Sequence, residues 1–336
     1  MDSLTHTVLG ACIGQALAGK KIGKQAMLWG AIANNLPDID VLTSFWMSQA
    51  TGLLAHRGFT HSILFALLVS PLLAFLFHRW YRKTTMTFKD WLLIFGTGNF
   101  IHIFIDSLTC YGTGWFEPFS HTRIAFNVLF VADPFYTISI LISCIALLII
   151  SKNNVFRNRW AKIGIVISTC YIFYAIVNKI TIDHKTESEL ARQHISYNRY
   201  FANPTPLNNW LWYLVAQNDS GYFIGYRSLF DKQLNIEFNY YPMHKELIDA
   251  IPEDDDLKAL KRFSQGYFAA EQKADTIYFS DIRFGQLGGW SNSKVPFVFR
   301  YTLHEKANND LVIQRGRMAF SGRDAIRSLM ERVKGN

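Results

Sequence analysis

Four stretches of this sequence are apolar over the length that a helix needs to cross a lipid bilayer, roughly 20 residues with a tolerated range of about 17 to 25. They are residues 59–77, 91–108, 134–150 and 163–180. Two earlier stretches, 4–19 and 25–45, are weaker, because the first is short and the second contains polar residues around Pro37. These two are expected to span the membrane, or to enter it as re-entrant or interfacial helices.

Beyond residue 183 the pattern changes to that of a water-soluble domain. Aromatic and β-branched residues recur at strand length in 222–229, 234–241, 276–284 and 295–304, with Asn, Asp and Gly between them. Residues 255–263 and 323–333 suit helices. We therefore predict an α-helical polytopic membrane domain of four to six membrane segments over residues 1–183, followed by a soluble α+β domain over residues 184–336.

Positive charge is concentrated in the apolar part of the chain. The net charge is +8, and residues 1–183 have 14 Lys or Arg against 8 Asp or Glu, whereas residues 184–336 have 20 against 18. The excess lies in short loops, which is typical of membrane orientation signals and not of a nucleic-acid-binding surface. No nucleic-acid partner is expected.

The loop charges also predict an orientation, because Lys and Arg in short loops are retained on the cytoplasmic side. With six passes, eleven basic residues fall in the first, third and fifth loops, whereas two, Arg57 and Arg123, fall in the second and fourth. The amino terminus, the second and fourth loops and the soluble domain are therefore expected on the outer face.

Imidazole and carboxylate groups gather at that predicted outer face. A charge at the centre of a membrane helix costs roughly 2.5 to 3.5 kcal/mol on insertion scales, so each such group calls for a reason. Seven potential metal ligands from four segments lie near the outer ends: His6, Asp38, Asp40, His56, His61, His102 and Asp106. A single histidine of this kind is more often a hydrogen-bonded structural residue, but seven groups on one face favour a metal site.

The sharpest local pattern is the pair His102 and Asp106. A spacing of i, i+4 places both side chains on one helix face about 6 Å apart, so both can reach one ion. Asp38 and Asp40 follow Pro37 in a bent segment, where an aspartate pair can bind or bridge cations. The alternative for this pair is a helix cap or a turn.

Arg57 lies between His56 and His61. Its guanidinium matches the geometry of phosphate or carboxylate oxygens, and an interfacial anchor is the alternative interpretation. Imidazole and carboxylate ligands without convergent thiolates favour zinc, with manganese or iron as alternatives, over a structural cysteine site. Such a centre would generate hydroxide from bound water near neutral pH. With Arg57 and Asp40 as catalytic groups, this predicts hydrolysis of an ester or phosphoester.

Four segments carry a family resemblance: MDSLTH at 1–6, LPDID at 36–40, HRGFTHS at 56–62 and HIFID at 102–106. They resemble the YdjM-like bacterial inner-membrane proteins described as metal-dependent hydrolases. The resemblance implies an inner-membrane location. It also implies distant similarity to zinc-dependent phospholipase C, whose His-x-x-x-Asp helix His102 and Asp106 match. The amino-terminal nitrogen that binds zinc in that enzyme is expected to have no counterpart, because His6 is internal.

Three functions follow as hypotheses. The first is a hydrolase of a membrane lipid or another amphiphilic substrate, because the cluster would lie beside lipid head groups. The second is a transporter that carries ions or protons, although residues 134–150 and 163–180 lack charges at their centres. The third is a non-catalytic membrane protein whose helices a metal ion stabilises.

Overall fold

The computed structural model describes residues 1–151, 154, 156–303 and 323–335 and forms two compact units. The first unit contains Met1–Thr43, Ala55–Ile176 and Pro206–Asn208. The second contains Ser44–Leu54, Val177–Thr205 and Asn209–Asn336. The boundary near residue 177 lies inside a long helix, α7, which continues past residue 183 to Arg192.

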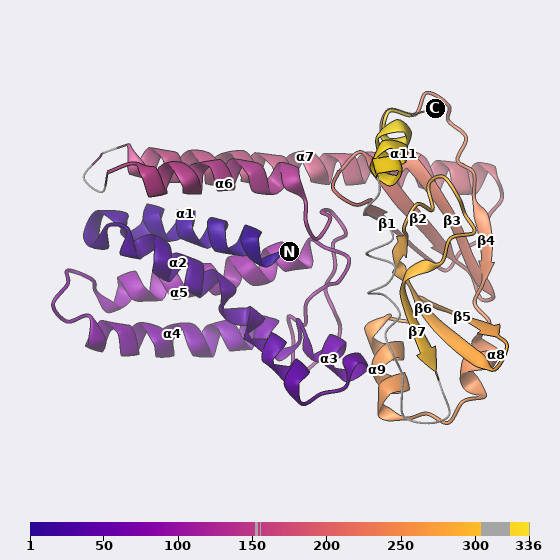
Figure 1. Ribbon diagram of the computed structural model, residues 1–336, viewed down its shortest axis with the longest axis horizontal. Helices are drawn as coiled ribbons and strands as arrows, with labels where there is room; N and C mark the ends of the chain where they lie inside the picture. The colour runs from indigo at the N-terminus through magenta and orange to yellow at the C-terminus, as the bar shows by residue number, and fades with distance from the viewer. Residues whose placement is uncertain (152–153, 155, 304–322, 336) are drawn as a thin grey trace. The chain divides into compact units, whose positions relative to one another are not determined.

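The first unit is a bundle of helices (Figure 1). Its elements are α1 (Ser3–Ile22), α2 (Gln25–Asn35), most of the 3₁₀ helix η1 (Leu36–Phe45), the 3₁₀ helix η2 (Phe59–His61), α4 (Ile63–Trp80), α5 (Phe88–Ser107), α6 (Pro134–Ile149) and the first part of α7 (Arg157–Arg192). Side-chain caps fix where several begin. Ser62 accepts a hydrogen bond from the Phe65 amide at the start of α4, and Thr87 forms a capping box at the start of α5.

Glycines allow α1 and α2 to pack at very short range. A Cβ atom on Gly10 would lie 2.4 Å from the Gly30 carbonyl oxygen, and one on Gly14 would lie 1.9 Å from the Ala26 carbonyl oxygen. The two backbones therefore approach more closely than any larger residue would permit. Around this pair, buried apolar side chains of α1, α5, α6 and α7 form one cluster, and those of α2, α4 and α5 form another.

Two helices among the described residues are long and apolar enough to cross a membrane, α4 and α7, and α6 is apolar but shorter. Large apolar side chains such as Leu68 and Ile149 are exposed on α4 and α6, which suits contact with lipid. α5 also carries Lys89, Asp90 and Asp106, which make it less apolar. α2 has 11 residues and ends before Pro37, so at about 1.5 Å per residue it is too short to cross a bilayer.

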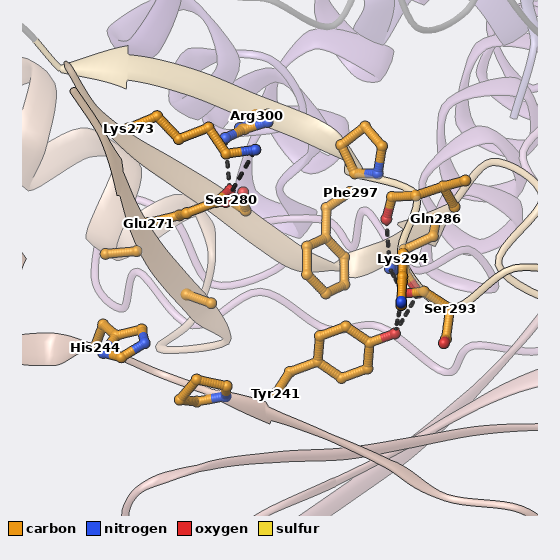
Figure 2. Close-up of a pocket in the computed structure, with 15 residues that line it drawn as sticks. Tyr241, His244, Glu271, Lys273, Ser280, Gln286, Ser293, Lys294, Phe297 and Arg300 are labelled. Atoms are coloured by element: carbon orange, nitrogen blue, oxygen red, sulfur yellow. Dashed lines mark hydrogen bonds and ion pairs between the residues drawn. The ribbon is translucent and has the colours of Figure 1, made fainter.

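The second unit contains two antiparallel sheets. The four-stranded sheet has the order β1 (Arg199–Pro204), β2 (Leu211–Gln217), β3 (Gly221–Ser228) and β4 (Asn239–Pro242); the three-stranded sheet has the order β5 (Phe268–Lys273), β6 (Thr276–Gln286) and β7 (Phe297–Leu303). Its short helices are α3 (Gln49–Ala55, all but its last residue), α8 (Lys245–Asp249), α9 (Asp255–Phe263) and α11 (Arg323–Val333). A cavity lies between β4 and the second sheet (Figure 2).

The predicted helices of this unit, 255–263 and 323–333, coincide with α9 and α11. The predicted strand at 234–241 is wrong over most of its length, because β4 begins at Asn239. The predicted strand at 295–304 begins two residues too early, and its last residue, His304, lies outside the described residues. Three strands, β1, β2 and β5, were not predicted. β1 contains Asn203 and Pro204, residues that are rare in strands, and β2 is buried on both faces and therefore lacks alternation.

Candidate metal centre

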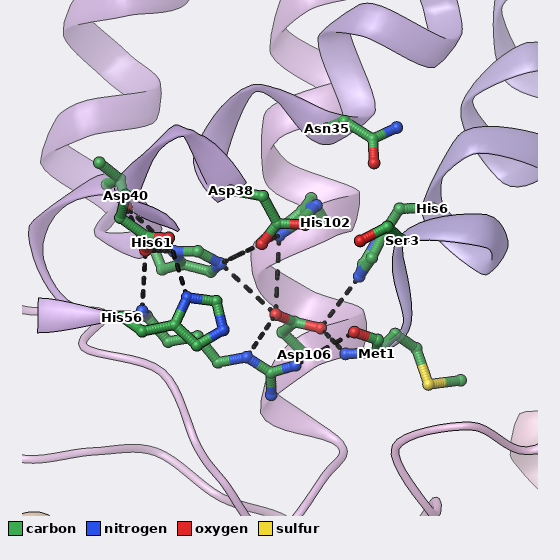
Figure 3. A network of polar contacts seen from close by, with 12 residues as sticks. Met1, Ser3, His6, Asn35, Asp38, Asp40, His56, His61, His102 and Asp106 are labelled. Atoms are coloured by element: carbon green, nitrogen blue, oxygen red, sulfur yellow. Dashed lines mark hydrogen bonds and ion pairs between the residues drawn. The ribbon is translucent and has the colours of Figure 1, made fainter. Parts of the chain in front are cut away.

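Four separate segments of the first unit bring imidazole and carboxylate side chains together (Figure 3). They are the start of α1 with His6, η1 with Asp38 and Asp40, the loop and η2 with His56 and His61, and the end of α5 with His102 and Asp106. Asp2 caps α1 by accepting a hydrogen bond from the Thr5 amide at 3.0 Å, which places His6 in the first turn. The predicted convergence is thus present in the geometry of the folded chain.

Asp38, His61, His102 and Asp106 form a first ligand group, with one donor atom of each within 4.8 Å of all the others. The Nε2 atoms of His61 and His102 are 3.0 Å apart. Asp38 Oδ1 lies 3.5 Å from each of these nitrogens, and Asp106 Oδ2 lies 3.4 Å from His61 Nε2 and 3.6 Å from His102 Nε2. Ligand atoms about 2.0 to 2.2 Å from a tetrahedral zinc ion are about 3.3 to 3.6 Å apart. The four oxygen–nitrogen spacings fit such an ion, and the 3.0 Å between the two nitrogens is somewhat shorter.

The far nitrogens of both imidazoles are held by acceptors. His102 Nδ1 donates to the Asn34 carbonyl oxygen at 2.5 Å, and His61 Nδ1 lies 3.2 Å from Asp40 Oδ2. A carbonyl oxygen can only accept, so His102 carries its proton on Nδ1 and presents an Nε2 lone pair to the group. This second-sphere arrangement, in which the far nitrogen donates to oxygen, is typical of histidines that bind metal.

The charges of the first group also call for a cation. Asp106 Oδ2 is buried and accepts no hydrogen bond of good geometry among the described residues, although Arg57 Nε lies 2.9 Å away as an ion-pair partner. A proton on His61 Nε2 can form a hydrogen bond to one of the neighbouring acceptor atoms. A divalent ion can instead bind one lone pair from each of the four residues of the group. The residues of this group therefore fit a metal ion, and the chemistry of the donors does not distinguish zinc from manganese or iron.

Two groups of the centre lie in the short 3₁₀ segments outside the long helices. Burial opposes ionisation of Asp40, but hydrogen bonds from His56 and His61 outweigh it and hold the pKa of this carboxyl well below its usual range. Burial alone would lower the pKa of His61, but Asp106, Asp38 and Asp40 raise it to about 9. Without a metal ion, His61 is therefore protonated at neutral pH.

Asp106 is surrounded by groups that orient it. Arg57 Nε lies 2.9 Å from Oδ2, and His6 Nε2 lies 3.0 Å from Oδ1, which also contacts the amino group of Met1. The His6 ring stacks on that of His102, with 3.8 Å between the ring centres. His6 is thus placed beside the first group, as a partner of Asp106 and His102.

Arg57 directs its guanidinium at protein atoms. It is 3% exposed, and besides its pairing with Asp106 it donates from Nη1 to Thr109 Oγ1 at 2.9 Å and from Nη2 to the Met1 carbonyl oxygen at 3.3 Å. Its backbone has φ of 60°, and its amide donates to Asp40 Oδ2 at 2.8 Å. A positive φ at a non-glycine residue is strained, and this amide hydrogen bond holds it in place.

A second ligand group consists of Asp38, Asp40 and His56. His56 Nδ1 lies 2.8 Å from Asp40 Oδ1. The side chain of His56 is 34% exposed, so this group lies nearer the surface than the first group, in which Asp38 is 23% exposed and the other three side chains are fully buried. Asp38 belongs to both groups and is placed to bridge them.

Two other residues of ligand type, His121 and Asp133, take no part in either ligand group. His121 is 58% exposed and pairs with Glu117 at 2.8 Å. Asp133 Oδ1 caps α6 by accepting hydrogen bonds from the amides of Phe135 and Tyr136, which accounts for its buried position without a metal.

Sequence reasoning missed several participants. The carbonyl oxygen of Asn34 orients His102, and Thr60 Oγ1 donates to Asp40 Oδ2 at 2.9 Å. The Met1 amino group contacts Asp106, although the zinc-binding amino terminus of phospholipase C was expected to have no counterpart in this chain. Backbone carbonyl and amino-terminal groups cannot be identified from residue types in a sequence. Thr60, by contrast, lies inside the segment HRGFTHS and could have been proposed as a partner of the ligands.

Comparison with known proteins gives three matches. The family model described as YdjM inner membrane protein matches residues 1–182. Inner membrane protein YbcI of Escherichia coli (strain K12) is 38% identical over 123 residues, which cover 36% of this chain and 69% of that protein. Uncharacterized protein YfhP of Bacillus subtilis (strain 168) is 26% identical over 313 residues, which cover 89% of this chain and 90% of that protein. No solved structure matches.

Proposed function

Because the chain belongs to the YdjM inner membrane protein family, we propose that it is a membrane-bound metal-dependent hydrolase of an ester or phosphoester. The observation that carries the proposal is the spacing of the four donor atoms of Asp38, His61, His102 and Asp106, 3.0 to 3.6 Å for the contacts that involve the two imidazoles. A divalent ion bound at the centre would supply Lewis acidity and would lower the pKa of bound water. Zinc is the ion we favour.

The two ligand groups suit different tasks. The first supplies four protein ligands and is buried, which is typical of a closed site, whereas the second supplies three and leaves a position open to solvent and substrate. We assign the reaction to the second group. Asp40 is a ligand candidate of this second group, and it also positions His61 of the first group by holding its Nδ1 atom.

The charges of the centre favour an anionic substrate. Its charged side chains are Asp38, Asp40, Asp106, Arg57 and Arg123, the last of which donates to the His56 carbonyl oxygen at 2.9 Å. With neutral imidazoles these five side chains have a net charge of −1. One divalent ion would bring the net charge of the centre to +1, and two ions would bring it to +3. A positive site in a low-dielectric setting stabilises the negative oxygens of a phosphoester. We assign Arg57 to holding Asp106, since its donors already meet protein acceptors.

Apolar side chains beside the ligands favour an amphiphilic substrate. Ile39 and Val41, which alternate with Asp38 and Asp40 along η1, are 50% and 62% exposed, and Phe59 beside His61 is 47% exposed. Acyl chains could contact these residues while the head group reaches the metal. We further propose that α4, α5, α6 and α7 cross the membrane and that α1 and α2 form a re-entrant pair, because α2 is too short to span. The centre and the second unit then lie on the extracytoplasmic face, as the loop charges predict.

The test combines metal content with activity. Detergent-purified wild type is expected to contain zinc and to hydrolyse at least one lipid or phosphoester of a broad panel. His102→Ala should lose both properties, whereas the matched control His121→Ala, at an exposed histidine outside the centre, should keep both. A fully metal-loaded wild type without hydrolase activity across the panel would contradict the proposal.

One observation favours a second candidate, a metal ion that only stabilises the helix bundle. The first group is closed and joins η1, η2 and α5, as a structural ion would. The variant His56→Ala separates the two functions, because it alters only the second group. Retained metal in the first group with lost activity supports the hydrolase, whereas unchanged cellular function in His56→Ala and His102→Ala supports the structural role.

A further inference from the structure

The second unit holds a cavity that the metal centre does not use. Its volume is about 380 Å³, within the range of roughly 300 to 1,000 Å³ that is usual for small-molecule sites. It lies between the edge strand β4, the chain that follows it, and the sheet β5–β6–β7 (Figure 2). Its walls therefore come from both sheets of this unit.

One wall is a loop that buried polar side chains hold in place. Gln286 is 5% exposed, and its Nε2 donates to the carbonyl oxygens of Ser293 and Val295 at 3.1 and 2.6 Å. The Tyr241 hydroxyl also donates to the Ser293 carbonyl oxygen. These hydrogen bonds fix the backbone on either side of Lys294, so this residue is presented from a preorganised loop.

The lining is positively charged. Lys273 and Arg300 both pair with Glu271, at 3.0 and 2.7 Å, so this carboxylate neutralises one of the two. Lys294 has no carboxylate partner within the part of the chain that the structure describes. Three cationic side chains against one carboxylate leave two positive charges on the lining. An anion is the ligand that this balance favours.

Apolar surface completes the cavity. Phe297 and Tyr241 meet edge to face with 5.5 Å between ring centres, and the small residues Ala269 and Ala270 leave room in front of them. Figure 2 shows the Phe297 ring between Arg300 on one side and Lys294 on the other. A flat apolar body can pack on this ring while a charged group reaches a cation.

We propose that this cavity binds a small organic anion, with its charged head at Lys294 and its flat apolar body against Phe297. The site is independent of the metal centre and of the hydrolase activity proposed for it. It gives the second unit a role in ligand recognition.

The probe is 4-fluorophenylacetate, and its binding to the full chain in detergent is measured by ¹⁹F NMR, with empty micelles subtracted. The neutral analogue 4-fluorophenylacetamide has the same shape without the charge. We expect the acid to bind at least about tenfold more tightly than the amide, because a charge-assisted contact is lost in the amide. Equal binding of both, or no binding of the acid, would overturn the proposal.

Variants locate the bound probe. Lys294→Gln and Phe297→Ala should each weaken binding of the acid by about tenfold. The control Lys258→Gln, at an exposed lysine of α9 outside the lining, should bind as wild type does. Lys294 is exposed, so its variant tests the site even where Phe297→Ala fails to fold. Unchanged affinity in Lys294→Gln, or loss of binding in the metal-centre variant His102→Ala, would refute this location.

Discussion

His102 Nδ1 donates a hydrogen bond to the carbonyl oxygen of Asn34 at 2.5 Å, which ties a metal-ligand candidate on α5 to the last turn of α2. The orientation of this imidazole therefore depends on where α2 lies. Contacts between the glycines of α1 and α2 determine that position, so residues without functional groups control the geometry of the centre.

Gly30→Ala should damage both the bundle and the centre. A Cβ atom there would lie 2.1 Å from the Gly10 carbonyl oxygen, and such overpacking costs about 1 to 3 kcal/mol. We expect a lower melting temperature in detergent and reduced bound metal. Gly96→Ala on α5 is the matched control, because a Cβ atom there meets nothing within 4 Å. Equal behaviour of the two variants would show that the glycine contact is unimportant.

Asp40→Asn should weaken metal binding without abolishing it. The variant removes the charge that orients His61 of the first group, and loss of a carboxylate that holds a metal-binding histidine costs about 10- to 100-fold in affinity or activity. A titration with a competing chelator measures the change. Asp183→Asn, which alters a carboxylate paired with Lys179 in the second unit, should leave the affinity unchanged. A wild-type affinity in Asp40→Asn would exclude this role.

Arg57→Met should destabilise the protein strongly. It leaves the buried carboxylate of Asp106 without its guanidinium, and removal of one partner from a buried ion pair costs about 3 to 5 kcal/mol. The double variant Arg57→Met, Asp106→Asn should recover part of the lost melting temperature but bind less metal than wild type. If the double variant is no more stable than the single one, the pair does not contribute in this way.

Metal affinity should rise with pH. The carboxylates around His61 raise its pKa to about 9 in the metal-free protein, so below that pH a metal ion must displace a proton. The displacement of one proton weakens apparent affinity by about tenfold for each pH unit below about 9. Titrations at pH 6, 7 and 8 in matched ionic strength test this slope. A pH-independent affinity over that range would mean that His61 is already neutral without metal.

The grouping of the candidate ligands could be predicted from the sequence because His and Asp are rare in apolar segments, and because the i, i+4 spacing of His102 and Asp106 defines a helix face. The division of these residues into a deeper and a more exposed ligand group could not be predicted from the sequence. It depends on the bend after Asn35, which turns Asp38 toward α5 and Asp40 toward His56. The pairing of Arg57 with Asp106 was also not predictable, since the two are far apart in the chain.

In the second unit, helices with strong amphipathic patterns such as α9 matched their predicted bounds. β2, by contrast, is buried at six of its seven positions, and a strand without exposed residues shows no alternation from which to recognise it. The sheet order was likewise inaccessible, because it depends on pairings between residues such as Ala202 and Leu214 that no local pattern specifies.

The position of the ligands along the chain has a consequence for biosynthesis. A ribosome has already produced α1, η1, η2 and α4 before His102 and Asp106 emerge at the end of α5. The first group is therefore completed only when α5 has folded beside α2. Binding of an ion by this group, as proposed above, would be a late step, available only to chains whose first helices have already assembled.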